Sequence, residues 1–171
     1  MAWSPRECRR IGSGCHLWAV LRWRTDLDAW LRSRALRNQE TGDSRTFVLC
    51  EGERVVAFYA LTTASAVRVS LPGPLRRNAP DPVPLMLLGQ LAVATRHRGQ
   101  GLGSRLLRDA LIRVAATSRH VGFRALATHP IDDEASRFYA RFGFTAIPGS
   151  QPRLMVLPLP RLLAAVKAAD R

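Results

Sequence analysis

A glycine-rich segment in the middle of the chain has the residue types of an anion-binding turn. It reads Arg98-Gly99-Gln100-Gly101-Leu102-Gly103, and an amphipathic pattern typical of a helix follows it directly. The alternating glycines leave backbone N–H groups uncovered, so several donors and the positive end of the helix dipole converge on one point, which a pyrophosphate fits. The spacing matches neither the GxGxxG dinucleotide loop nor the GK[ST] triphosphate loop. Taken alone, the segment is equally consistent with a simple turn between a strand and a helix.

An aromatic cluster further along the chain contains the best candidate for acid–base chemistry, Tyr139. A phenol has an ordinary pKa of ~10, so it stays protonated at neutral pH and can donate a proton to a departing group. The alternative is a core aromatic, because its neighbours Phe138, Phe142 and Phe144 are typical packing residues. Phe138 and Phe142 are four residues apart and share one helix face, whereas Tyr139 is rotated by about 100° toward a neighbouring face. This phase favours chemistry for Tyr139 and burial for a stripe formed by Ala135, Phe138 and Phe142.

No general base stands out beside this tyrosine. His97, His120 and His129 are available, but a single histidine is more often structural or exposed than catalytic. We expect water to serve as the base, or none to be needed.

A strand, the glycine-rich turn and a helix follow one another without interruption. Leu85–Ala94 is almost wholly apolar, which predicts a central strand covered on both faces, and Gly89 inside it suggests a bulge or a close backbone approach. The predicted buried stripe of the helix consists of Leu106, Leu107, Ala110, Leu111, Val114 and Ala115. Its predicted outer side carries Arg105, Arg108, Asp109 and Arg113.

The remaining pattern predicts a single α/β domain over residues 25–171, preceded by an extension of uncertain order over residues 1–24. A helix begins at Thr25, with a buried face made of Leu27, Trp30, Leu31 and Ala35. Strands are predicted over Thr46–Cys50, Val55–Thr63, Val67–Leu71, Phe123–Thr128, Phe144–Ile147 and Arg153–Leu157. Five prolines predict a long loop over residues 72–84, and Arg161–Ala169 is expected to form the last helix.

Composition limits the classes of function. The chain has 171 residues and a formal charge of +13, and Lys167 is its only lysine. Such a charge predisposes a protein to nucleic acid, an anionic membrane or a phosphate-rich cofactor, although arginine usage equally reflects a GC-rich genome. Three scattered cysteines provide neither a disulfide framework nor zinc spacing, so we expect no metal. No apolar stretch reaches the ~18–20 residues of a membrane helix and no signal peptide is recognisable, so we expect a cytoplasmic location without membrane binding.

The order of these motifs resembles the GNAT superfamily of acetyl-CoA-dependent N-acetyltransferases. The resemblance rests on Leu91-Ala92-Val93, on Arg98 with Gly101 and Gly103, and on the segment from Ala135 to Phe144, and it covers residues 85–146. It implies a mixed central sheet, splayed at the acetyl-CoA site and flanked by helices, with pantetheine along Leu91 and Val93. It also implies that the CoA pyrophosphate is held by Arg98, Gly99, Gln100, Gly101, Leu102, Gly103 and Ser104. Tyr139 takes the family's general-acid position, where it protonates the CoA thiolate.

A narrower resemblance over residues 26–158 is to the GNAT toxins of type II toxin-antitoxin systems. It rests on Asp28-x-Trp30-Leu31, on the proline-rich run from Arg77 to Val93, and on Gly99–Gly103 before Leu106-Leu107-x-Asp109-Ala110. Those enzymes acetylate the α-amine of aminoacyl-tRNA and stop translation. The resemblance implies aminoacyl-tRNA as the substrate and a ribbon-helix-helix antitoxin as a partner, and it leaves room for a homodimer. The chain departs from these toxins at Gln90, where they commonly have arginine, and at Thr128-His129-Pro130, where they commonly have Val-His-Ala.

The positive charge has a specific role in this interpretation. Arg76, Arg77 and Arg96 flank the predicted cofactor site and are candidates for binding tRNA phosphates. An aminoacyl ester also explains the missing base, because a free α-amine has a pKa of ~7.7–8.0 and esterification of its carboxylate lowers that value.

Two alternative functions remain open. The first is a GNAT enzyme that acetylates a small amine, a polyamine or a protein N-terminus. Cationic substrates favour an acidic pocket, but the acidic cluster Asp132-Asp133-Glu134 is better explained as the start of a helix. The second is a non-catalytic basic module that binds nucleic acid or has a regulatory role, and the intact turn and Tyr139 count against it.

Overall fold

The computed structural model describes residues 9–10, 25–52 and 54–169, with only the backbone described at 9–10 and 25–28. Apart from Arg9 and Arg10, the extension predicted over residues 1–24 lies outside the described residues. The chain forms two compact units. The first unit is the chain up to Thr62 together with Gly89–Ala110, and the second is Thr63–Leu88 together with the chain from Leu111 onward.

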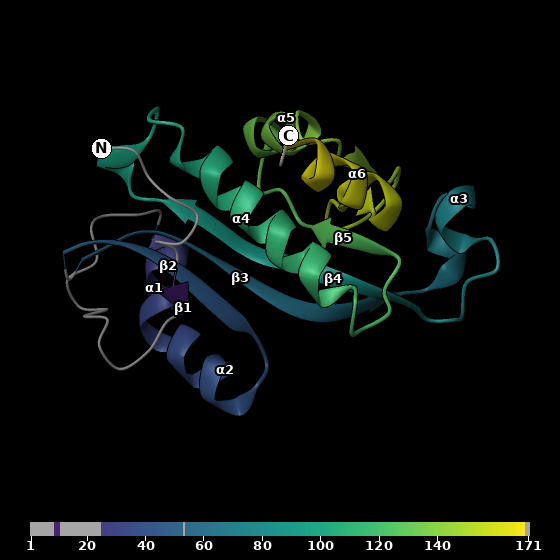
Figure 1. Cartoon of the computed structure of the whole chain (residues 1–171), viewed down its shortest axis with the longest axis horizontal. Helices are drawn as coiled ribbons and strands as arrows, with labels where there is room; N and C mark the ends of the chain where they lie inside the picture. Colours follow the sequence, from purple (N-terminus) through teal and green to yellow (C-terminus); the bar gives the residue numbers. More distant parts are fainter. Residues whose placement is uncertain (1–8, 11–24, 53, 170–171) are drawn as a thin grey trace. The chain divides into compact units, whose positions relative to one another are not determined.

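The first unit is built on antiparallel strands. Its elements are β1 (Arg9–Arg10), α1 (Thr25–Ser33), α2 (Ala35–Thr41), β2 (Arg45–Glu51), the first part of β3 (Arg54–Ala66), the end of β4 (Val83–Val93) and the beginning of α4 (Leu102–Thr117). β2 pairs with β1 and with β3, and the register places Phe47 opposite Tyr59. α1 and α2 lie together, and α2 contacts β2 (Figure 1).

Both faces of β3 are covered in the first unit, because every residue from Val55 to Leu61 is buried. On one face the ring of Trp30 from α1 stacks on Phe58, with 5.8 Å between ring centroids. Phe47 stacks on Tyr59 at 5.1 Å. The strand therefore contributes to packing on two sides, as its continuous apolar run allows.

The second unit contains the parallel strand pair. Its elements are the end of β3, α3 (Gly73–Arg76), the start of β4, the end of α4, β5 (Ala125–Thr128), α5 (Asp133–Ala140), β6 (Thr145–Ala146), β7 (Met155–Pro158) and α6 (Leu159–Ala169). β5 is parallel to β4 and antiparallel to β7, and β7 is antiparallel to β6. α6 contacts β5 and β7 (Figure 1). The hydrogen-bonded order of the described strands is β1-β2-β3-β4-β5-β7-β6, a mixed sheet, which confirms the predicted fold class.

Two predictions between β3 and β4 are wrong. The expected strand Val67–Leu71 is instead a 3-10 turn at Arg68–Ser70, where the Asp81 carboxylate accepts the backbone N–H of Arg68 at 3.1 Å. The expected loop over residues 72–84 contains α3 and the start of β4. Prolines are compatible with a short helix when they occupy its first turn, where their missing N–H has no intrahelical partner to lose. Leu75 of α3 anchors this segment in the core of the second unit.

The predicted outer side of α4 is also wrong at one position. Asp109 is only 3% exposed, and the hydroxyl of Tyr59 donates a hydrogen bond to its carboxylate within the first unit. A buried carboxylate requires such a partner, because its desolvation is otherwise unfavourable. Asp109 was predicted to lie on the outer side because its side chain is charged. Its hydrogen-bond partner, which makes burial possible, lies on a strand fifty residues earlier in the sequence.

Candidate active site

The glycine-rich turn has the backbone conformation that its sequence predicts. β4 ends at Val93, a 3-10 turn follows over Thr95–His97, and α4 begins at Leu102. Gly99 and Gly101 have φ angles of +76° and +75°, in the left-handed region that strains any residue with a side chain. An added Cβ would meet open space at both positions, so the backbone conformation, and not crowding, requires glycine there.

The first turn of α4 presents amide donors. The N–H of Arg105 bonds to the carbonyl of Gly101 at 3.2 Å, so intrahelical bonding begins at Gly101. By helix geometry, the amides of Leu102, Gly103 and Ser104 have no acceptor inside the helix and point out of its N-terminus. The dipole of this 16-residue helix adds positive potential at the same place. The turn and the helix together have the uncovered donors and the positive potential that suit an anion.

β4 continues beyond the strand with which it pairs in parallel. β5 pairs with Met86–Leu88 and ends at Thr128, whereas β4 runs on to Val93. Leu91 and Val93 are half-buried in this continuation. Where a strand extends beyond the end of its partner strand, its backbone N–H and C=O groups on that edge are available to an extended ligand.

Arg96, a predicted phosphate ligand, has an acidic neighbour. Its guanidinium lies 3.6 Å from the carboxylate of Glu51, and Nε2 of His97 lies 3.5 Å from the same carboxylate. The Arg96 side chain is 52% exposed and that of Glu51 is 66% exposed, so water screens this pair and it contributes only ~0–1 kcal/mol. A phosphate at Arg96 therefore competes with a weakly held carboxylate. Arg98 is exposed on the turn itself.

Tyr139 is buried in the second unit. Its ring contacts those of Phe138, at 5.2 Å, and Phe144, at 5.4 Å between centroids. Burial raises the pKa of the phenol above its usual value, and the neighbouring hydroxyl of Thr128 lowers the pKa by a smaller amount. The phenol is therefore protonated at neutral pH, as a general acid must be.

The buried face of α5 differs from the predicted stripe. Ala135, Phe138 and Phe142 are only half-buried, whereas Tyr139 is 7% exposed. The helix is short, and Phe144 beyond its end packs back against Tyr139, so a residue outside the helix sets the buried face. The position of Tyr139 around the helix therefore does not by itself distinguish a catalytic role from a packing role, because Tyr139 is packed in the core.

Thr128 is a buried neighbour of Tyr139 that was not among the predicted site residues, although it belongs to the departure from Val-His-Ala noted in the sequence. It is 2% exposed, and its Oγ1 donates to the carbonyl of Leu88 at 3.1 Å. Leu88 is the last β4 residue that pairs with β5, so this hydroxyl lies where the parallel pairing ends. The available signal was a single hydroxyl at the end of the otherwise apolar segment Ala125–Ala127.

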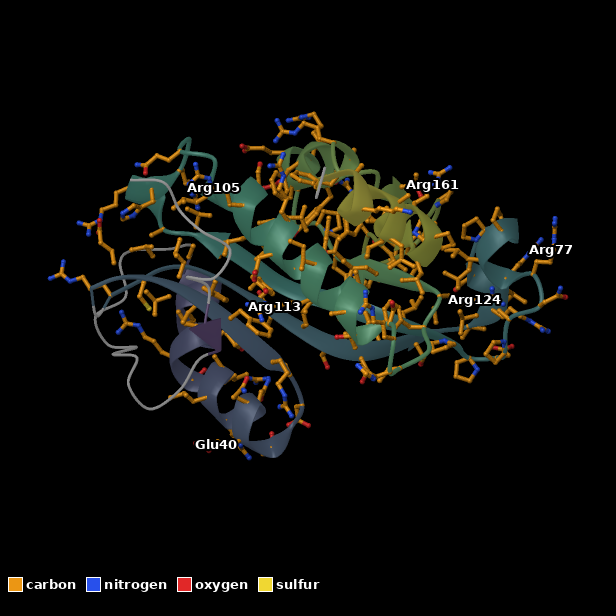
Figure 2. All side chains as sticks on the ribbon, in the orientation of Figure 1. Glu40, Arg77, Arg105, Arg113, Arg124 and Arg161 are labelled. Atoms are coloured by element: carbon orange, nitrogen blue, oxygen red, sulfur yellow. The ribbon has the colours of Figure 1, made fainter. Side chains whose placement is uncertain are left out.

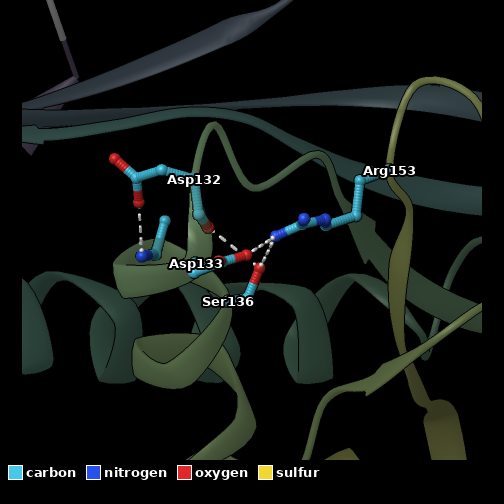
Figure 3. A network of polar contacts seen from close by, with 5 residues as sticks. Asp132, Asp133, Ser136 and Arg153 are labelled. Carbon is cyan, nitrogen blue, oxygen red and sulfur yellow. Dashed lines mark hydrogen bonds and ion pairs between the residues drawn. The ribbon is translucent and has the colours of Figure 1, made fainter.

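Figure 3 shows the polar contacts that hold the start of α5. The Asp132 carboxylate accepts the backbone N–H of Ala135 at 2.8 Å, which caps the helix. Arg153 Nη1 donates to Asp133 Oδ1 at 2.6 Å and to Ser136 Oγ at 2.9 Å. The Arg153 guanidinium holds the pKa of Asp133 below its usual value. Two carboxylates of the acidic cluster thus serve to fix α5.

Comparison with known proteins decides which family contains this arrangement. Residues 42–146 match the family model described as an acetyltransferase (GNAT) domain. The chain is 44% identical over 149 residues to the tRNA-acetylating toxin of Mycobacterium tuberculosis, which covers 87% of this chain and 90% of the relative. The chain belongs to the GNAT acetyltransferase family. The predicted family and enzyme class are confirmed.

Two solved structures share the fold of this GNAT domain. AtaT complexed with acetyl-methionyl-tRNAfMet has a TM-score of 0.81 at 22% identity, covering 96% of this chain and 98% of that chain. An AtaT variant bound to the C-terminus of the antitoxin AtaR and acetyl-CoA has a TM-score of 0.78 at 20% identity, covering 94% and 97%. At these identities the likeness establishes the fold.

The predicted site residues of the GNAT domain are divided between the two units. The first unit contains Leu91, Val93, Arg96 and Arg98–Ser104, and the second contains Arg76, Arg77 and Tyr139. The first unit thus has the glycine-rich turn and the strand edge, and the second has the candidate acid.

Arg76 and Arg77 belong to a basic hollow in the second unit, here called the α3 hollow. It has a volume of about 430 Å³ and is lined by Arg68, Val69, Gly73, Arg76 and Arg77. Figure 2 labels Arg77 near α3, with Arg124 beside it. Arg124 Nη2 donates to the carbonyls of Arg77 and Asn78 at 3.3 and 2.7 Å, which holds the chain at this point. Guanidinium groups around a hollow suit an anionic ligand.

The histidines considered as bases have other contacts or are exposed. His97 faces Glu51, and Nδ1 of His129 lies 2.9 Å from the carbonyl of Arg153. His120 is exposed after the end of α4. Among the described residues, no three His, Cys, Asp or Glu side chains gather as metal ligands do. None of the helices in the described part of the chain is long and apolar enough to cross a membrane.

Proposed function

We propose that this GNAT enzyme transfers the acetyl group of acetyl-CoA to the α-amine of aminoacyl-tRNA, and so blocks translation as a toxin. The observation that carries this proposal is the 44% identity with a tRNA-acetylating toxin. Because that identity extends over 87% of this chain and 90% of the relative, it is not confined to a cofactor-binding half that acetyltransferases of many specificities share.

Acetyl-CoA, in this proposal, occupies the anion-binding turn and the free edge of β4. The pyrophosphate accepts hydrogen bonds from the amides of Gly99–Ser104, and the exposed Arg98 adds a positive charge beside them. Pantetheine pairs with the backbone of Leu91 and Val93 as an added strand does. The presence of acetyl-CoA in an AtaT structure of the same fold supports this placement.

The transfer needs an acid more than it needs a base. The amine nitrogen attacks the thioester carbonyl carbon, the C–S bond breaks, and the thiolate takes a proton from Tyr139. An alkyl thiol has a pKa of ~8.5, so protonation of the thiolate makes it a better leaving group at neutral pH. The α-amine of an aminoacyl ester has a pKa below the ~7.7–8.0 of a free α-amine, so a large fraction is already nucleophilic and water accepts its proton.

The tRNA phosphates, we propose, bind at the α3 hollow. Arg76 and Arg77 are exposed there beside Arg68, with Arg124 fixing the backbone next to them. Arg96 is the weaker candidate of the three predicted residues, because Glu51 already faces its guanidinium.

Labelled acetyl-CoA distinguishes this proposal from its alternatives. The protein is incubated with bulk aminoacyl-tRNA, with uncharged tRNA, with polyamines and with a peptide panel, and the label is followed in each fraction. We expect label on aminoacyl-tRNA and none on uncharged tRNA. Label on polyamine or peptide alone would overturn the substrate assignment while leaving the enzyme class intact. Absence of label together with absence of acetyl-CoA binding would leave a non-catalytic basic module.

A toxin of this kind acts in the cytoplasm, where aminoacyl-tRNA and acetyl-CoA occur together, and it requires a neutralising partner. We propose an antitoxin as this partner, in line with the AtaR segment bound to AtaT, and we take its ribbon-helix-helix class from the toxin resemblance. A short reading frame next to this one, whose product binds the protein and suppresses acetylation, is the expected observation. Light scattering of the purified protein at several concentrations tests whether it forms the homodimer for which the toxin resemblance leaves room.

A further inference from the structure

Thr128 carries a buried hydroxyl to which the proposed reaction gives no role. It ends β5, whose other residues Ala125, Leu126 and Ala127 are apolar and buried. A hydroxyl in such surroundings is unfavourable unless it is hydrogen-bonded, and Thr128 meets this requirement through the carbonyl of Leu88 at 3.1 Å. Valine has nearly the same shape and would fill the same space, so packing alone does not require threonine here.

The same hydroxyl has a second neighbour within the second unit. The phenol of Tyr139, which is 7% exposed, is close enough to Thr128 for the hydroxyl to stabilise the ionised phenol. A threonine hydroxyl has a single proton, and rotation about its C–O bond decides which acceptor receives it. With the phenol neutral, the Leu88 carbonyl is the acceptor that the structure shows. A phenolate is the stronger acceptor, because hydrogen bonds to charged groups are roughly twice as strong as neutral ones.

We propose that Thr128 is a positioning residue that acts through Tyr139, turning its hydroxyl from the Leu88 carbonyl to the phenolate as Tyr139 gives up its proton. In that step the O–H bond of Tyr139 breaks, its electron pair stays on the phenolate oxygen, and the proton bonds to the sulfur of the departing thiolate. The amine proton released on amide formation passes through water and restores the phenol. The atoms and charges then balance, with one thiol and one amide formed.

This proposal rests on the proposed function, because it assumes that Tyr139 is the acid. Its physical reason is an unfavourable proton transfer. A phenol has an ordinary pKa of ~10 and an alkyl thiol one of ~8.5, and burial moves the phenol of Tyr139 further from the thiol. A hydrogen-bond donor that turns to Tyr139 only when the phenolate forms reduces this difference in pKa. It does so without changing the interactions of the neutral phenol that carries the proton.

The ionisation of Tyr139 is measurable without catalysis. The chain has two tyrosines, Tyr59 and Tyr139, so incorporation of 3-fluorotyrosine gives two fluorine NMR signals that Tyr59→Phe and Tyr139→Phe assign. The fluorinated phenol ionises at lower pH than tyrosine, which moves the titration away from the range of alkaline unfolding. Circular dichroism over the same pH range checks that each variant stays folded.

Thr128→Val is the test variant and Thr128→Ser the conservative one. We expect Thr128→Val to raise the pKa of Tyr139 by about one unit and to lower kcat about tenfold, with the KM for acetyl-CoA unchanged, and Thr128→Ser to restore both. Thr145→Val is the matched control, since Thr145 donates to the carbonyl of Val156 at 3.4 Å on β6, and it should change neither quantity.

The outcomes separate this proposal from the proposed function. An unchanged pKa of Tyr139 in Thr128→Val overturns the role of Thr128, even if kcat falls, because a structural defect alone would then explain the loss. A raised pKa with unchanged kcat also overturns it. Full activity of Tyr139→Phe instead refutes Tyr139 as the acid, whatever the titration shows for Thr128.

Discussion

The two tyrosines of this chain are both buried, yet their hydroxyl groups have different surroundings. The hydroxyl of Tyr59 donates a hydrogen bond to the carboxylate of Asp109. Tyr139 has the neutral hydroxyl of Thr128 as its neighbour. A proton that is not committed to a carboxylate is available for transfer, so the surroundings of Tyr139 suit an acid and those of Tyr59 suit a structural tie between β3 and α4.

Removal of the Tyr139 hydroxyl tests its role directly. Tyr139→Phe keeps the ring and its contacts with Phe138 and Phe144, so we expect unchanged acetyl-CoA affinity by calorimetry and a kcat lower by about 10²–10⁴. Tyr59→Phe is the matched control, because it removes a buried hydroxyl outside the proposed site and should lower thermal stability more than kcat. Full turnover by Tyr139→Phe would reduce Tyr139 to a packing residue.

At the scale of elements, the segment from β4 through the turn to α4 was predictable because its signals are local. An apolar run, glycines at alternate positions and an amphipathic pattern each depend on residues close in sequence. The 3-10 turn at Arg68–Ser70, by contrast, depends on Asp81, and the burial of Asp109 depends on Tyr59. The proposed role of Thr128 likewise depends on the pairing of β5 with Leu88, which no local pattern contains.

Gly101→Ala tests whether the turn conformation determines cofactor affinity. The position has a φ of +75°, which costs an alanine ~1–2 kcal/mol, so we expect the Kd for acetyl-CoA to rise about tenfold as the turn relaxes. Gly122→Ala is the control, since its Cβ also meets open space but its φ is not in the left-handed region. Equal affinity in the two variants would show that the turn does not hold the pyrophosphate.

The anchor of α5 gives a pH dependence of stability. The pKa of Asp133 in the folded chain lies below its ordinary value of 3.8 because of the hydrogen bond and charge of Arg153. Because the carboxyl has a lower pKa in the folded chain than in the unfolded chain, its ionised form stabilises the fold at any pH above the unfolded pKa. This stabilisation is lost as the pH falls through the folded pKa. We therefore expect Asp133→Asn to melt at a slightly lower temperature than the wild type at pH 7, with the difference vanishing well below pH 3.8. A difference that persists at the lowest pH would contradict this origin.

At the scale of the whole molecule, the formal charge of +13 is carried almost entirely by arginine. Figure 2 shows labelled arginines on several elements, including Arg105 and Arg113 of α4, Arg161 of α6 and Arg77 next to α3. Most of these positions give a general attraction for polyanions, which depends on salt but not on position. Only an arginine that touches a phosphate changes the number of counterions released.

Salt dependence separates these two kinds of charge. The double variant Arg76→Ala with Arg77→Ala should raise the KM for aminoacyl-tRNA and reduce the slope of log affinity against log salt by about 2. Arg119→Ala with Arg161→Ala removes the same charge from exposed positions elsewhere, and it should leave the slope nearly unchanged. Equal slopes in both double variants would assign tRNA binding to general charge and not to the α3 hollow.

The last turn of α6 carries Lys167, the one lysine of the chain. An enzyme that acetylates amines can also acetylate its own lysine side chains, because a neutral lysine amine is a nucleophile. Guanidinium groups stay protonated and do not react. Arginine in almost every cationic position therefore gives this protein a charge that suits a polyanion, while the only lysine side chain open to self-acetylation is Lys167. An intact-mass spectrum after prolonged incubation with acetyl-CoA should accordingly stay simple, however active the enzyme is.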